Sequence, residues 1–109
     1  MAYDELLASQ LRDLLADAPG VTEKKMFGGL CLLLEGKMFM GIIKDELMVR
    51  VGPERWAEHL AKPGVREMDF TGRSMKGYVY VGAEAIRSPE ELAEWIEAGR
   101  QFVAEHILK

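Results

Sequence analysis

The first part of the chain carries apolar residues at helical spacing. Leucines stand at positions 6, 7, 11, 14 and 15, while Arg12, Asp13 and Asp17 fall on the other side. An apolar stripe with a period of about 3.6 residues is typical of an amphipathic helix that packs on a core. Pro19-Gly20 follows, and neither residue readily continues a helix. The pattern therefore predicts a helix over residues 3–17.

Short apolar segments, separated by turn residues, follow this helix. The expected strands are residues 21–27, 30–34, 38–43 and 47–51. The turns between them are Gly28-Gly29, Glu35-Gly36 and Lys44-Asp45, and the second favours positive φ at its glycine. This order predicts an antiparallel meander of four strands.

The second half of the chain alternates helical and extended signals. It contains a short helix opened by Gly52-Pro53-Glu54, an extended segment at 66–70, a polar loop at 71–77, a strand at 78–81 and a long C-terminal helix. Ser88 and Glu91 stand three residues apart at the start of that helix, which is the spacing of a capping box.

These elements predict an α+β fold of two layers, in which an antiparallel meander is covered on one face by the N- and C-terminal helices. The strands at 30–34 and 38–43 are apolar at nearly every position, so both of their faces should be buried. Two long helices cover one face of such a sheet. We expect the other face to meet a second copy of the chain, with Met38 and Met40 projecting together into a homodimer interface.

Length and composition indicate one soluble domain. The chain has 109 residues, which we interpret as a single domain over residues 1–109 without an internal linker. No apolar run reaches the roughly 20 residues of a membrane span, and the N-terminus is acidic where a signal peptide would be basic. The single cysteine, Cys31, agrees with a reducing compartment, so a cytoplasmic location is expected.

The charges are unevenly distributed. The net charge is −4, and residues 50–87 carry seven basic and five acidic side chains between two acidic ends. This small central surplus does not resemble the dense basic stripe of a nonspecific DNA-binding protein. Nucleic acid is therefore an alternative partner, which would use Lys24, Lys25, Arg50, Arg73 and Lys76 if the fold gathers them.

The chain lacks an obvious set of catalytic or metal-binding residues. His59 and His106 belong to two different predicted helices, and Cys31 lies within a leucine-rich strand. Metal sites need clustered ligands, and a reactive thiol needs a basic neighbour. We therefore expect no enzyme activity, no metal and no cofactor, and we interpret Cys31 as a packed core thiol.

The segment Asp69–Tyr78 is the most concentrated group of polar residues. Its cations and hydroxyls could hold a phosphate or carboxylate, and the candidate anion- or partner-binding residues are Arg73, Lys76, Ser74 and Thr71. The alternative is a structural role, in which Arg73 pairs with Asp69 or bonds to nearby backbone.

Three segments resemble the TfoX (Sxy) N-terminal domain family: residues 23–29 (EKKMFGG), 45–51 (DELMVRV) and 68–81 (MDFTGRSMKGYVYV). The resemblance covers nearly the whole chain. It implies the stand-alone form of a domain that, in longer members, precedes a helical domain in regulators of natural competence genes. It also implies a two-layer fold similar to secretion-chaperone-like domains, which form dimers, and it supplies no catalytic residues.

Three functions follow as hypotheses. The first is a non-enzymatic, homodimeric interaction domain that acts in gene regulation through protein contacts. The second is the nucleic-acid-binding module described above. The third is a protein that binds a small anionic ligand at the Asp69–Tyr78 loop, or an enzymatic role at the same loop, which lacks an obvious base there.

Overall fold

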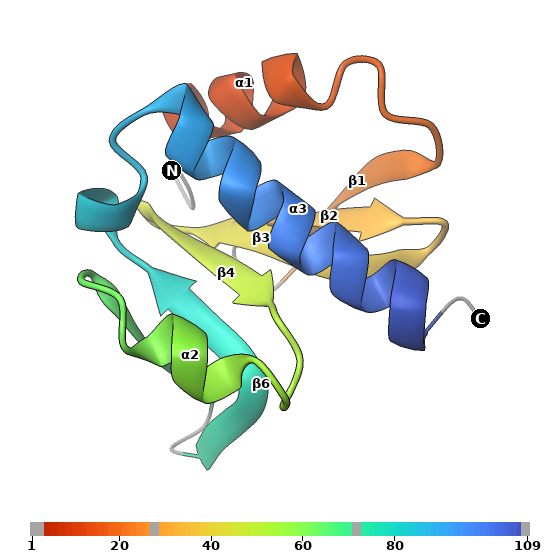
Figure 1. The fold of residues 1–109 in the computed structure, drawn as a ribbon. Helices are drawn as coiled ribbons and strands as arrows, with labels where there is room; N and C mark the ends of the chain where they lie inside the picture. Colours follow the sequence, from red (N-terminus) through yellow and green to blue (C-terminus); the bar gives the residue numbers. More distant parts are fainter. Residues whose placement is uncertain (1–3, 27–28, 71–72, 108–109) are drawn as a thin grey trace.

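A computed structural model describes residues 4–26, 29–70 and 73–107, and the side chains at positions 26, 68–70 and 73–75 are not described. Figure 1 shows a sheet with helices packed on it. The elements in chain order are α1 (Glu5–Leu14), β1 (Val21–Met26), β2 (Gly29–Leu34), β3 (Lys37–Ile43), β4 (Glu46–Arg50), α2 (Trp56–Leu60), β5 (Val65–Phe70), β6 (Arg73–Val81), the 3₁₀ helix η1 (Ala83–Ala85) and α3 (Pro89–His106). The predicted α+β fold is confirmed.

The six strands form one antiparallel sheet with the order β1-β2-β3-β4-β6-β5. The first four strands are the predicted meander. The chain then crosses α2, forms β5 at the far edge and returns as β6 between β5 and β4. This return places residues near position 80 beside residues near position 48, although the two groups lie far apart along the sequence.

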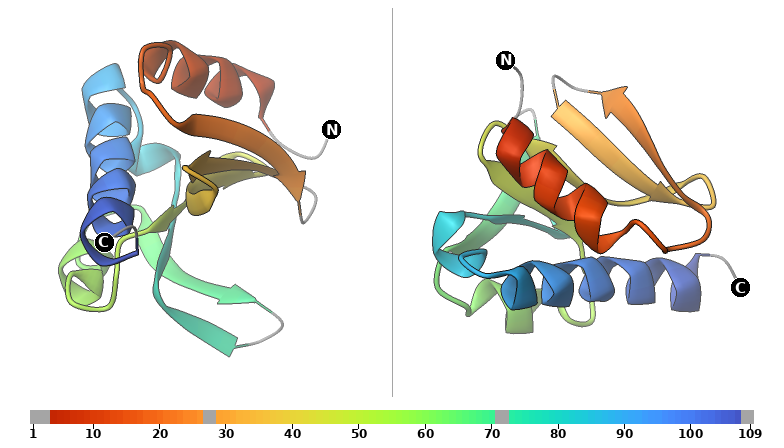
Figure 2. Two further views of the ribbon diagram at one scale, coloured as in Figure 1. Left: turned by 90° about the vertical axis from the view of Figure 1, so that its right-hand side faces the viewer. Right: turned by 90° about the horizontal axis from the view of Figure 1, so that it is seen from above.

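All three α-helices pack on one face of the sheet, as the two views of Figure 2 show. The core between the layers contains leucines of α1, the apolar side of α3 and one face of the central strands. Asp4 caps α1 by accepting from the backbone N–H groups of Leu6 and Leu7, and Arg12 of α1 pairs with Glu23 of β1 at 2.8 Å. The core and this ion pair fix α1 against the β1 edge.

The capping box predicted at the start of α3 is confirmed. The Ser88 hydroxyl accepts from the backbone N–H of Glu91, and the Glu91 carboxylate accepts from the backbone N–H of Ser88. Two donors that a helix end leaves unpaired are thereby satisfied. The cap sets where an 18-residue helix begins and so which of its residues face the sheet.

The turn between β2 and β3 has the predicted geometry. Glu35 and Gly36 have φ values of 49° and 83°, which are the left-handed values of a tight hairpin turn. A glycine adopts such a value without the steric cost that a side chain adds. The turn therefore sets the register in which β2 and β3 begin to pair.

A β-bulge in β3 overturns the prediction that Met38 and Met40 share one face. Leu32 pairs with Met40 and the next residue, Leu33, pairs with Met38, so Phe39 is an extra residue in β3. Both Phe39 and Met40 are fully buried under the helices, whereas Met38 packs on the opposite side of the sheet. Met40 therefore belongs to the helix-side core and not to the uncovered side.

The polar loop predicted at residues 71–77 is mostly strand. β5 runs to Phe70 and β6 starts at Arg73, and the two strands pair up to this point. Gly77 lies inside β6 with a φ of 92°, and its carbonyl accepts from the backbone N–H groups of Val51 and Gly52. Gly77 therefore joins β6 to the segment that leads into α2.

No helix in the described part of the chain packs on the second face of the sheet. We call this surface the open face, and its central residues are Cys31, Met38, Ile43, Met48, Tyr78 and Tyr80. Among the described residues, no helix is long and apolar enough to cross a membrane.

Gly99 of α3 should be intolerant of a side chain. A Cβ atom there would lie 2.6 Å from the backbone oxygen of Phe39 and 3.1 Å from its Cδ2 atom. Alanine is the better helix former, yet we expect Gly99→Ala to lower the free energy of unfolding by about 1–3 kcal/mol because α3 must move off β3. Urea denaturation measures the change.

The matched control is Glu97→Ala, which places alanine at an exposed position of the same helix. It should change the free energy of unfolding by less than about 0.5 kcal/mol. Equal stability of Gly99→Ala and the unchanged protein would show that α3 is not held at this contact.

Candidate functional site

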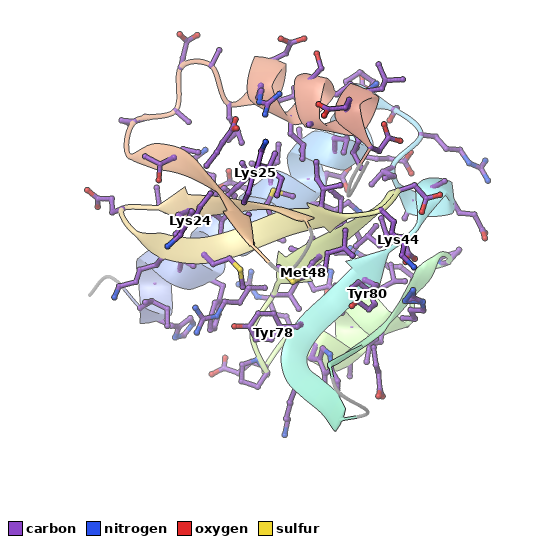
Figure 3. All side chains as sticks on the ribbon, turned by 180° about the vertical axis from the view of Figure 1, so that it is seen from behind. Lys24, Lys25, Lys44, Met48, Tyr78 and Tyr80 are labelled. Atoms are coloured by element: carbon purple, nitrogen blue, oxygen red, sulfur yellow. The ribbon has the colours of Figure 1, made fainter. Side chains whose placement is uncertain are left out.

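The open face is organised as a row of paired residues that crosses the whole sheet. Strand pairing places neighbouring members of the row opposite one another, and the row reads Lys24, Cys31, Gly41, Met48, Tyr80 and Arg66. Alternate residues of a strand lie on the same side, so Tyr78 and Arg50 extend the face on β6 and β4. Figure 3 looks onto this face and shows Lys24, Met48, Tyr78 and Tyr80.

The centre of the open face is apolar and closely packed. Cys31 and Met48 are only 3% exposed although no helix of the described chain covers them. They are surrounded by half-buried side chains, namely Met38, Ile43, Tyr78 and Tyr80. Burial raises the pKa of the Cys31 thiol, which agrees with the predicted packed core thiol.

Two arginines stack on the two tyrosines of β6. The Arg66 guanidinium lies 4.4 Å from the ring centroid of Tyr80, and that of Arg50 lies 5.7 Å from the ring of Tyr78. Arg66 also pairs with the Glu46 carboxylate at 2.6 Å, and Arg50 lies 5.2 Å from the ring of Phe102 in α3. The aromatic half of the open face is therefore also its cationic half.

The five basic residues of the nucleic-acid hypothesis do not gather on one surface. Lys24 and Lys25 are adjacent in β1, so their side chains project to opposite sides. Lys24 pairs with Cys31 of the open face, whereas Lys25 pairs with Leu30 of the helix-side core. Lys24 and Arg50 share the open face, and Lys25 does not.

The sequence did not single out Tyr80, Arg66 or Glu46. These residues meet only because β6 lies between β4 and β5. The alternation of tyrosine and valine in residues 78–81 is a signal that both rings share one face of a strand. It does not indicate which arginines those rings would meet.

The candidate anion site lies at the end of the β5–β6 hairpin. Asp69 pairs with Ser74 and Phe70 with Arg73 along the backbone, and Lys76 is exposed. Thr71 and the side chains of Arg73 and Ser74 lie outside the described residues. The anion site stays a prediction.

The double variant Arg73→Ala and Lys76→Ala tests that site. We expect the melting temperature to be nearly unchanged and binding of inorganic phosphate to be lost, because arginine and lysine hold anions through charge and hydrogen bonds. Calorimetric titration and a melting curve measure the two properties. A large loss of stability would show that the pair is structural, and unchanged phosphate binding would place the anion elsewhere.

His59 is the buried ionisable residue of the helical layer. Its ring centroid lies 5.2 Å from that of Trp95 in α3, and the Lys62 ammonium lies 3.1 Å from its Nδ1 atom. Burial, and then the positive charge of Lys62, lower the pKa of His59 below its ordinary value. In this arrangement the neutral imidazole accepts a hydrogen bond from Lys62.

This burial makes stability depend on pH. Because the pKa of His59 is lower in the folded chain than in the unfolded chain, protons bind the unfolded state more readily. The free energy of unfolding should therefore be highest above about pH 6.5 and should fall as the pH drops below that value. Urea denaturation between about pH 5 and 8 measures the slope.

The non-titrating variant His59→Phe keeps a ring against Trp95 and should flatten this slope. His106→Gln, at an exposed position of α3, is the matched control and should keep it. A slope that survives in His59→Phe would assign the pH dependence to other groups.

A pocket of about 540 Å³ lies between the end of α3 and the segment before α2. Its lining includes Pro53, Arg55, Phe102, Glu105 and His106. Within the ranges that the structure describes, no group of three or more His, Cys, Asp or Glu residues could hold a metal ion. Cys31 lies on the open face and His59 in the helical layer, so the two do not form a nucleophile and base pair.

The comparison with protein families agrees with the motifs found along the chain. The model of the TfoX N-terminal domain matches residues 13–103, which run from α1 to near the end of α3. No curated protein and no solved structure shows a match to this chain. The sheet, its two long helices and the three motifs all lie in the matched range or directly beside it, and the chain belongs to the TfoX N-terminal domain family.

Proposed function

We propose that the chain is a non-enzymatic interaction domain that acts in the regulation of gene expression, through protein contacts and as a homodimer. The observation that carries the proposal is the open face, where an apolar centre lies on the side of the sheet opposite the helices. The family to which the chain belongs is associated with the regulation of competence, and this supports a regulatory setting.

The β2–β3 half of the open face is suited to contact a second copy. Leu33 and Met38 are half-buried neighbours across these two strands, and Thr22 and Lys24 of β1 form a polar border beside them. An apolar centre with a polar border is the usual arrangement of a protein interface. Methionine also adapts its shape to a partner surface.

The size of the face limits the area of the dimer contact. The molecule measures 35 × 30 × 28 Å. One face of these dimensions offers roughly 1,000 Å², and specific interfaces bury about 800 Å² on each partner. The β2–β3 half supplies about half of this area, roughly 500 Å² on each partner, which is at the lower limit of a specific contact.

Two observations support a non-enzymatic role. The Cys31 thiol is buried and its pKa is raised, so it is protonated and a weak nucleophile. His59 is enclosed by Trp95 and Lys62 in the other layer. Neither side chain has the exposure and the neighbours that activate a catalytic group.

The chain should have the mass of a dimer in solution, and Met38→Glu should shift it to monomer. A carboxylate at Met38 would be buried without a partner in the interface, which we expect to weaken the dimer at least tenfold. Light scattering coupled to size exclusion at micromolar concentration measures the mass.

The matched control is Leu6→Glu, because Leu6 of α1 is 70% exposed and lies in the helical layer. This variant should remain dimeric. A monomer mass for the unchanged chain would refute the homodimer, and a folded, dimeric Met38→Glu would place its interface on another surface.

A further inference from the structure

The β4–β6–β5 half of the open face has a different character from the β2–β3 half. Its principal residues are Arg50, Arg66, Tyr78 and Tyr80, which we call the Arg–Tyr surface. Pairing across the strands places Arg50 opposite Tyr78, and Tyr80 between Met48 and Arg66. Two aromatic rings and the Arg66 guanidinium therefore lie together on one side of the sheet, and the Arg50 guanidinium lies between the rings of Tyr78 and of Phe102 in α3.

The two guanidinium groups are placed over the rings. The distances from guanidinium to ring centroid are 5.7 Å for Arg50 on Tyr78 and 4.4 Å for Arg66 on Tyr80. The Arg66 side chain is still 55% exposed, so its outer side faces solvent. Planar aromatic and guanidinium groups are the ones on which unstacked bases pack.

Charge is separated between the two layers of the molecule. α3 contains five glutamates and one arginine, and its exposed positions include Glu90, Glu94 and Glu97. The open face instead carries Lys24, Arg50 and Arg66, and the Glu46 carboxylate pairs there with Arg66. A polyanion would be repelled by the helices and attracted to the sheet.

The same charges argue against a second copy as the occupant of the Arg–Tyr surface. Two copies placed face to face here would bring Arg50 and Arg66 toward identical cations. The contact proposed for the dimer uses Leu33 and Met38 on β2 and β3, which leaves β5 and β6 available. Figure 2 shows the β5–β6 hairpin extending away from the rest of the sheet.

We propose that the Arg–Tyr surface binds single-stranded nucleic acid. Bases stack on Tyr78, Tyr80 and the guanidinium planes above them, and phosphates are neutralised by Arg50 and Arg66. Residues two apart in a strand are separated by about 6.5–7 Å, which is twice the 3.4 Å step of a duplex strand. This spacing suits bases that are already unstacked, and a duplex keeps its bases inside.

The proposal goes beyond the homodimer and does not depend on it. The test is the fluorescence anisotropy of a labelled oligothymidylate of about 12 nucleotides, with its duplex as comparison, at salt concentrations of about 50 to 200 mM. The single strand should bind more tightly than the duplex. With two cations in contact, a plot of the logarithm of the association constant against the logarithm of the salt concentration should have a slope of about −1.4.

Substitutions at Tyr80 separate stacking from apolar contact. Tyr80→Leu keeps an apolar side chain and removes the ring, and it should weaken binding of the oligothymidylate roughly 5- to 150-fold. Tyr80→Phe keeps the ring and should bind like the unchanged chain. Arg50→Ala should reduce the salt slope by about 0.7, and circular dichroism confirms that each variant is folded.

Three outcomes would overturn the proposal. The first is no binding at the lowest salt concentration. The second is equal binding of duplex and single strand with no effect of Tyr80→Leu, which would indicate phosphate contacts alone. The third is displacement of the bound oligothymidylate by polyglutamate at an equal concentration of charges. This result would indicate that the surface binds an acidic protein segment.

The oligomeric state, measured by light scattering, keeps this test separate from the test of the homodimer. Tyr80→Leu should leave the dimer intact, since its ring lies outside the proposed contact. A dimer that does not bind the oligothymidylate would refute this inference alone, and a monomer that binds it would refute the homodimer alone.

Discussion

The contact between Gly99 of α3 and Phe39 of β3 fixes the relation of the two layers. The backbone of the helix approaches so closely that a Cβ atom would lie 2.6 Å from the Phe39 carbonyl oxygen. Phe39 is fully buried below the helix, and Trp95 and Val103 pack on the sheet one turn away on either side. A larger residue at position 99 would hold the layers apart and leave cavities beside Phe39.

The bulge that contains Phe39 also decides which side of the sheet each residue of β3 occupies. The extra residue lets Phe39 and Met40 both enter the core, and it leaves Met38 and Ile43 on the open face. The core therefore receives two large side chains where regular alternation would supply one. The same irregularity makes the open face apolar at its centre.

The arrangement of charges gives the two surfaces of the molecule different electrostatic character. The long helix places its glutamates in solvent, and the sheet collects arginines beside aromatic rings. Arginines stacked on tyrosines lose less freedom when they bind a ligand, because their positions are already constrained. Side chains constrained in this way can make binding selective.

The sequence by itself determined the helices, the four-strand meander, the Glu35-Gly36 turn and the family. Apolar spacing set the helices, the Glu35-Gly36 turn set the β2–β3 hairpin, and Ser88 with Glu91 set the start of α3. Each of these features depends on residues that are close together along the chain, and local propensity and hydrogen bonding decide them. The leucine-rich strand also indicated correctly that both faces of the sheet contain buried residues.

Only the tertiary structure decided which side chains share a face. A one-residue bulge moved Met40 into the core, and no local pattern in residues 38–43 indicates where such a bulge falls, because every candidate residue there is apolar or glycine. The meeting of Arg66, Glu46 and Tyr80 depends on β6 pairing with β4, which are separated by more than twenty residues. Such pairings are chosen by the packing of the whole sheet on its helices, so the Arg–Tyr surface became visible only in three dimensions.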